Sequence, residues 1–323
     1  MKNYTVKKYE SSDYPQWNAF INEAKNATFL FHRDFMEYHS DRFSDFSMLV
    51  FEDEKLISVI PANRIGATVF SHQGLSYGGL VFDKNIRLGQ VLKVFSAVLS
   101  FLEQQQITHF QLKQLPFFYA KYLSDEIQYA LFLTDAKLIR RDTLSLIDLS
   151  KPFEYSRSKK AKIKLAATSG FTIVEETGFS EFWNQVLIPN LKQKHGVLPV
   201  HTIEEITLLK QRFPKNIRQF NVYQNDILVA GTTVFETETV AHAQYISGHL
   251  EQNKLGSIDF LYDFLLKNVY KNKPYFDFGT SNENAGCNLN EGLLYWKESF
   301  GSKIAVQDFY EVQTSHFTKL QNI

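Results

Sequence analysis

Polar side chains gather just after a short aromatic segment in the last quarter of the chain, and their types are suited to ligand binding or proton transfer. A strand is predicted over residues 275–278, in which Asp277 is the one charged residue. The loop 279–291 that follows is rich in hydroxyl and carboxamide side chains, among them Ser281 and Asn282. In open α/β sheets ligands bind outside the carboxyl ends of strands, so this loop could cradle a ligand. A surface turn whose Asn and Gly residues bond only their own backbone would have the same composition.

A reaction that moves a proton needs a proton acceptor, and two residues are candidates for that role. Asp277 could act as the base if its side chain reaches a crevice. Its neighbours Phe276 and Phe278 point to the opposite face of the strand. Alternatively, Asp277 is a buried carboxylate that accepts backbone N–H bonds from the turn at Gly279. His72 could be a base or could bind the acceptor, although a lone histidine is more often structural.

Further residues have side chains that could bind a substrate. Tyr245, Ser247 and His249 alternate along a predicted strand, which would direct three polar tips toward a cleft. The solvent face of a strand would give the same pattern. Tyr77 lies among glycines, where the backbone can approach a ligand closely. The cationic candidates for binding a phosphate are Arg33, Arg157, Lys160 and Lys297.

The densest positive charge in the chain lies near its middle. Residues 155–164 read YSRSKKAKIK and carry five cations without an intervening acid. Charge runs are usually the solvated face of a helix. The alternative is a site for phosphate, whether of a nucleotide sugar, of CoA or of RNA.

Several kinds of chemistry are excluded by the residue inventory. The single cysteine, Cys287, excludes an internal disulfide and a cysteine-based zinc site. The sequence shows neither Ser-His-Asp spacing nor a nucleophile elbow nor a metal-ligand cluster, so we expect direct transfer without a metal or a covalent intermediate. Lys plus Arg equals Asp plus Glu, 35 of each, which gives no electrostatic reason to expect DNA as a partner.

The elements that must position these side chains occur twice. A predicted hairpin, a third strand, a helix that begins at a glycine and a fourth strand follow one another in each half of the chain. The hairpins are expected over residues 46–64 and 220–235, and the helices begin at Gly89 and Gly256. Two matches in the same order indicate tandem copies of one mixed α/β domain.

The length of 323 residues also favours two domains, which we place at residues 1–150 and 151–323. The chain starts with charged residues and has no apolar run behind them, so a signal peptide is not expected. A membrane span is not expected either, because the longest apolar candidate, residues 91–102, is short and interrupted by Lys93. These features predict a cytoplasmic protein.

The repeated unit resembles the GNAT acyltransferase fold, and two such units in tandem resemble the Fem-type aminoacyltransferases that build peptidoglycan cross-bridges. The resemblance covers nearly the whole chain. Its carriers are HQGLSYGGL at 72–80, SRSKKAKIK at 156–164, YFDFGTSN at 275–282 and GLLYWKESFG at 292–301. It implies two tandem GNAT-like domains and an aminoacyl-tRNA donor with a nucleotide- or lipid-linked sugar peptide as acceptor. By the same analogy, Arg33 would lie on the acceptor side of the cleft.

One departure from the GNAT pattern concerns the cofactor. Single-domain GNAT enzymes hold the CoA pyrophosphate on a Gly-rich loop at the start of the helix after the fourth strand, where N–H groups and the helix dipole attract anions. The corresponding stretches here, residues 251–257 and 85–90, contain one glycine each. Acetyl-CoA or another acyl-CoA therefore stays possible as a donor, but with a weak pyrophosphate loop.

The sequence thus predicts an N-acyltransferase that acts on an amino group of a small molecule, an amino sugar or a cell-envelope precursor. One alternative is a GNAT-shaped binding protein for a nucleotide sugar or a peptide, without catalysis. Another is a tRNA-dependent aminoacyltransferase, whose tRNA binding should depend strongly on salt.

Overall fold

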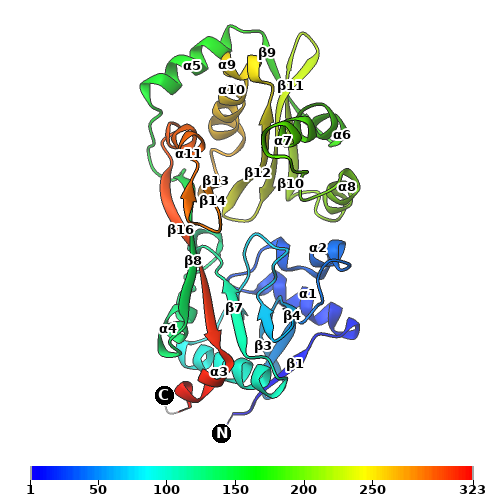
Figure 1. The fold of residues 1–323 in the computed structure, drawn as a ribbon, viewed down its shortest axis with the longest axis vertical. Coiled ribbons are helices and arrows are strands. Elements are labelled where there is room, and N and C mark those ends of the chain that lie inside the picture. Colours follow the sequence, from blue (N-terminus) through cyan, green and yellow to red (C-terminus); the bar gives the residue numbers. More distant parts are fainter. Residues whose placement is uncertain (1, 322–323) are drawn as a thin grey trace. The chain divides into compact units, whose positions relative to one another are not determined.

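The computed structural model describes residues 2–321, which form two compact units of mixed α/β structure (Figure 1). The first unit comprises the described residues up to Asp142 and those from Val306 onward, and the second comprises Thr143–Ala305. Strands β8 (Lys137–Asp148) and β16 (Lys303–Gln313) carry the chain from one unit to the other. The division into domains at residue 150 stays a prediction. Within residues 2–321, no helix combines the length and the apolar character that crossing a bilayer requires.

The first unit contains two sets of paired strands. An antiparallel sheet has the order β1-β2-β3-β6, and a second set has the order β4-β5-β7-β16, in which β5 and β7 are parallel. The bounds are β1 Tyr4–Lys8, β2 Met48–Glu52, β3 Lys55–Ile60, β4 Asn63–Ile65, β5 Thr68–Phe70, β6 Val81–Phe82 and β7 His109–Lys113.

Helix α3 (Leu88–Gln104) fills the core of the first unit. Val91, Phe95, Val98 and Leu102 recur at helical spacing and are fully buried, as the apolar stripe of an amphipathic helix should be. Among the described residues, the other α-helices of this unit are α1 Tyr14–Glu23, α2 Arg33–Met36 and α4 Glu126–Leu133.

The second unit is built on strands in the order β8-β13-β12-β11-β10-β9. Strands β9 to β12 pair antiparallel with their neighbours, whereas β12 and β13 run parallel. The bounds are β9 Phe171–Glu176, β10 Ile217–Gln224, β11 Ile227–Glu236, β12 Val240–Gly248 and β13 Tyr275–Thr280, followed by a small hairpin of β14 Asn282–Glu283 and β15 Asn288–Leu289.

Helices cover both faces of these strands, with α5, α9, α10 and α11 on one side and α6, α7 and α8 on the other (Figure 1). A π-helical turn at Trp183–Leu187 joins α6 to α7, and another at Leu265–Val269 extends α10. The bounds are α5 Arg157–Ala167, α6 Ser180–Phe182, α7 Ile188–His195, α8 Ile203–Arg212, α9 Leu250–Lys254, α10 Ser257–Phe264 and α11 Glu291–Glu298.

Candidate functional site

Strands β12 and β13 begin side by side and then part. Their pairing joins Val240 to Tyr275 and ends with His242 opposite Asp277, while β12 continues along β11 as far as Gly248. The register of β12 against β11 shifts just after His242, where Gln244 is an extra residue. An extra residue of this kind bends the strand and increases its twist, which accounts for the parting.

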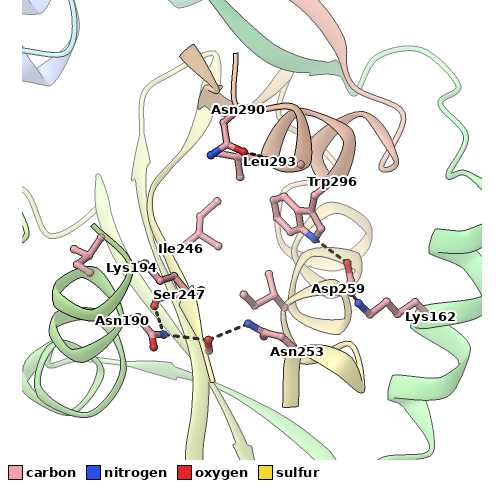
Figure 2. Close-up of a pocket in the computed structure, with 14 residues that line it drawn as sticks. Lys162, Asn190, Lys194, Ile246, Ser247, Asn253, Asp259, Asn290, Leu293 and Trp296 are labelled. Atoms are coloured by element: carbon pink, nitrogen blue, oxygen red, sulfur yellow. Dashed lines mark hydrogen bonds and ion pairs between the residues drawn. The ribbon is translucent and has the colours of Figure 1, made fainter. Parts of the chain in front are cut away.

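A cavity of about 540 Å³ lies in the second unit, where β12 has separated from β13. This volume is in the range of small-molecule sites. Figure 2 shows Ile246 and Ser247 of β12 between Asn190 of α7 and the α10 and α11 side chains Asp259 and Trp296. Its apolar lining consists of Leu191, Ile246, Ile258, Leu293 and Trp296.

Carboxamide side chains fix the end of β12 at this cavity. The Nδ2 of Asn190 donates to Ser247 Oγ at 2.8 Å and to the Gly248 carbonyl at 3.0 Å. Asn253 Nδ2 donates to the same carbonyl at 2.9 Å. Since the N–H of His249 donates to Val229 of β11, strand alternation turns the N–H groups of Ile246 and Gly248 toward the opposite edge, where the cavity lies.

The start of α10 is covered by α5. Gly256 caps α10 with a φ of +90°, and a Cβ at this position would lie 3.1 Å from the Lys162 carbonyl oxygen of α5. In the first turn, buried Asp259 forms an ion pair with Lys159 and accepts a hydrogen bond from Trp296 Nε1 at 3.0 Å. The protein's own carboxylate therefore lies where the helix dipole would attract an anion.

Charged groups also meet at the carboxyl end of β13. Asp277 is 1% exposed, and its Oδ1 accepts the N–H of Gly279 at 2.7 Å while its Oδ2 lies 3.0 Å from Nδ1 of His242. The ammonium of Lys297 donates to the carbonyls of Gly279 and Thr280 at 3.0 and 2.6 Å. Burial lowers the pKa of Lys297 to about 8, and the charge of Asp277 opposes that shift. Asp277 is thus buried and accepts a backbone N–H bond from Gly279, as expected for a structural carboxylate and not for a catalytic base.

The other candidates of the second unit are not gathered at one place. Ser247 lines the cavity, whereas Tyr245 is buried with its hydroxyl 2.6 Å from Nδ1 of His201. His249 caps the short helix α9. Ser281 is buried, and Asn282 accepts the N–H of Thr143 at 2.7 Å.

The basic run forms helix α5 and divides between its two faces. Lys159 is buried, and burial lowers its pKa although the charge of Asp259 opposes the shift. Arg157, Lys160 and Lys164 are exposed, and their spacing places them on one face of the helix. Part of the run is therefore structural and part is available at the surface.

The candidates in the first unit are buried. Arg33 pairs with Asp45 at 2.8 Å and lies over the ring of Tyr9 at 3.9 Å, as a structural cation would. Tyr77 donates to Thr28 Oγ1 at 3.0 Å.

His72 is buried and has a φ of +65°, in the left-handed region. Its ring stacks on that of His39 with 5.1 Å between centroids. Burial lowers the pKa of His72 to about 3, so the ring is neutral at physiological pH.

The parallel strands of the first unit, β5 and β7, do not part in the same way. Beyond their last pair the N–H of Ser71 donates to Gln111 O at 2.9 Å, and Lys113 N donates to Ser71 Oγ at 2.8 Å. Gly78 N then donates to Lys113 O at 2.8 Å, and a Cβ at Gly78 would lie 1.8 Å from the Ser71 carbonyl oxygen. The loop after β5 therefore fills the space beside β7. The corresponding space of the second unit, beside the end of β12, is the cavity.

Sequence reasoning missed several residues of the cavity and of the β13 end, namely Asn190, His242, Asp259 and Trp296. Asp259 had a local signal, since it is the one acid in the first turn of a helix that begins at a glycine. The others come from separate elements and carry no local pattern.

No family model matches the chain, and no curated protein matches it. Solved structures do match its fold. The crystal structure of FemX aligns over 98% of this chain and 100% of its own, with a TM-score of 0.68 and 10% identity. L-PGS from Bacillus licheniformis aligns over 97% of this chain and 95% of its own, with a TM-score of 0.61 and 11% identity.

A tandem GNAT protein from the clavulanic acid biosynthesis pathway aligns over 97% of this chain and 99% of its own, with a TM-score of 0.50 and 11% identity. Identities this low establish a shared fold and leave the activity open. The predicted mixed α/β class and the tandem GNAT fold are therefore confirmed, and the chain has the fold of FemX and of the tandem GNAT protein.

Proposed function

We propose that the chain is an N-acyltransferase that holds the acyl group of its donor in the cavity between β12 and α10–α11. The observation that carries the proposal is the parting of β12 and β13 at a cavity toward which backbone N–H groups are turned. The N–H groups of Ile246 and Gly248 would donate to the acyl oxygen as it becomes negative. One such donor typically lowers the barrier by about 3 to 4 kcal/mol.

The reaction needs no covalent intermediate. The nitrogen of a neutral amine forms a bond to the acyl carbon, and the bond between that carbon and the donor's leaving oxygen or sulfur breaks. The proton lost by the attacking nitrogen passes to a base, and the leaving atom takes up a proton. The acceptor we propose is an amino sugar or a cell-envelope precursor with a free amino group.

The second unit is the better place for this reaction. In the first unit, Ser71 and Gly78 bond along β7 just where an acyl group would have to enter. In the second unit β12 corresponds to β5, and beyond its last pair with β13 its edge faces a cavity. We therefore assign the first unit a role other than binding the acyl group.

The covered start of α10 favours a donor other than acetyl-CoA. A pyrophosphate at this helix end would meet the carboxylate of Asp259 and the main chain of α5 at Lys162. The Fem-type resemblance of the sequence supports an aminoacyl-tRNA donor instead, and the fold shared with FemX agrees with that resemblance.

A panel of donors tests the function. Radiolabelled acetyl-CoA and tRNA charged with labelled amino acids would be offered separately, each with glucosamine and with a nucleotide-linked sugar pentapeptide. We expect label to move from aminoacyl-tRNA to an acceptor and not from acetyl-CoA. Transfer from acetyl-CoA alone would overturn the donor, and saturable acceptor binding without any transfer would favour the non-catalytic binding protein.

Filling the cavity should stop transfer. Leu293 lines it from α11, so Leu293→Trp should lower the transfer rate on the order of a hundred-fold by displacing the acyl group. The matched control is Tyr295→Trp on the same helix, because Tyr295 is 65% exposed and should tolerate the change. Full activity of Leu293→Trp would show that the acyl group lies elsewhere.

The tRNA-dependent form of the proposal has its own observation, the exposed cationic face of α5. Replacing its three cations with glutamine should weaken binding of uncharged tRNA and make the slope of log affinity against log salt shallower by about 2 to 3. Filter binding at several salt concentrations measures this slope. An unchanged slope would place the tRNA elsewhere. The variant is Arg157→Gln/Lys160→Gln/Lys164→Gln, and its control with three exposed lysines of the first unit is Lys55→Gln/Lys84→Gln/Lys93→Gln.

A further inference from the structure

A histidine lies at the point where β12 and β13 part. His242 forms the last pair of the two strands, opposite Asp277. Its side chain is 19% exposed, whereas that of Asp277 is 2% exposed. The imidazole is therefore the half of this pair that a substrate can reach.

The bonds of Asp277 define which nitrogen of the imidazole carries the proton. An ionised carboxylate only accepts hydrogen bonds, and Oδ2 of Asp277 lies 3.0 Å from Nδ1 of His242. In the neutral ring Nδ1 must then donate, which leaves the lone pair on Nε2. Oδ1 of the same carboxylate is fixed by the N–H of Gly279 at 2.7 Å, so the carboxylate cannot turn away.

The position of His242 is compatible with the cavity. Phe276 and Phe278 pack with Ala241 in the core on the α10 side, so His242 and Asp277 face the other side of the strands. Ser247 shares that side, since its hydroxyl bonds Asn190 of α7. His242 precedes Ile246 by four residues, one of which is the extra residue Gln244, so the two lie at most about 13 Å apart along the strand. The imidazole, the amine and the acyl group together span much of this distance, and one water can complete the path.

We propose that His242 is the proton acceptor of the transfer reaction and that Asp277 is the residue that positions it. This inference rests on the proposed function. Nε2 of His242 takes the proton from the nitrogen as that nitrogen bonds the acyl carbon, directly or through one water. The imidazolium that forms is stabilised by Asp277 and then returns the proton to the leaving oxygen. Carboxylate-oriented histidines act in this way in other enzymes.

A further charged group near this pair is Lys297 of α11. Its ammonium is held by the carbonyls of Gly279 and Thr280, and the N–H of the same Gly279 bonds Asp277. Asp277 thus lies between a cation and an imidazole. Its negative charge partly neutralises the positive charge of Lys297 when the imidazole is protonated.

Single-turnover rates of transfer test the proposal. The donor is tRNA charged with a mixture of labelled amino acids, and the acceptor is the nucleotide-linked sugar pentapeptide. His242→Gln should lower the rate by roughly a hundred- to ten-thousand-fold while leaving tRNA binding unchanged. Added imidazole should restore part of the rate of His242→Ala and none of that of Asp277→Asn. The control is His109→Gln in the first unit, which should keep the wild-type rate.

Two outcomes separate the failure of this inference from that of the proposed function. If the wild-type protein transfers label and His242→Gln does so equally fast, His242 is not the base and the function stands. If the wild-type protein transfers nothing, the function itself fails.

Nitrogen-15 spectra of labelled histidine give a readout that does not depend on activity. They should show the Nδ1–H form of His242 in the wild-type protein and a shift toward the Nε2–H form in Asp277→Asn, whose amide can donate to Nδ1. A wild-type ring protonated on Nε2 alone would overturn the proposal whatever the rates.

Discussion

Replacing Asp259 with leucine should lower the unfolding free energy of the second unit by about 3–5 kcal/mol. Asp259 is 3% exposed and Lys159 is 4% exposed, so the substitution leaves a buried ammonium without its counter-ion. The indole N–H of Trp296 also loses its acceptor. Removing one partner of a buried pair costs far more than the pair contributes, because the remaining charge has no water to solvate it.

Urea unfolding followed by tryptophan fluorescence measures the loss, since Trp183 and Trp296 both lie in the second unit. The double variant Lys159→Met/Asp259→Leu should recover most of the stability because it removes both charges. The exposed pair of Glu251 with Lys254 provides the control, and Glu251→Ala should cost no more than about 1 kcal/mol. A double variant as unstable as Asp259→Leu would show that packing, and not the stranded charge, causes the loss.

The second large effect concerns pH. The pKa of Lys297 falls from 10.5 to about 8 on folding because burial disfavours the ammonium. Between these pH values Lys297 binds more protons in the unfolded chain than in the folded chain. The contribution of Lys297 to the unfolding free energy therefore rises as pH rises. The burial penalty is fully present below about pH 8 and is relieved by about pH 10.5. A shift of this size corresponds to roughly 3 kcal/mol.

The difference in unfolding free energy between the wild-type protein and Lys297→Met isolates this effect. Other buried amines, such as Lys113 with a pKa lowered to about 8, are common to both proteins and cancel. We expect the difference to be constant up to about pH 8 and then to change in favour of the wild-type protein. Urea midpoints from pH 7 to pH 10.5 at fixed ionic strength would record it. A difference that stays constant throughout would show that the ammonium of Lys297 has the same pKa in the folded and the unfolded chain.

Local sequence patterns predict several of the helices. Helix α8 (Ile203–Arg212) has such a local signal, because Thr202 and Glu205 form a capping box at its start. The glycine-started helix of each half corresponds to α3 and α10, both of which bury an apolar stripe. Such signals depend on neighbours within one turn of helix, which is why the sequence alone reveals them.

The cavity and strand β16 depend on contacts between distant residues. The bulge at Gln244 opens the gap beside β13, and nothing in the alternation of β12 marks an extra residue there. In β16, Gln307 and Val312 are buried among partly exposed neighbours, so the strand lacks the period of two that identifies a half-buried strand. Asp277 is recognisable in the sequence as a candidate because it is the one acid in an aromatic strand. Whether its Oδ2 forms a hydrogen bond depends on His242, which is 35 residues away along the chain.

The first unit is completed by residues that follow the entire second unit along the chain. Phe309–Gln313 of β16 pair with β7, and Val312 and Leu320 belong to the buried cluster around α3. During synthesis the ribosome therefore finishes Thr143–Ala305 before the edge of β7 has its partner. Multidomain chains generally fold from the amino terminus onward. Here the unit that is made first keeps an open edge on β7 until β16 has been synthesised.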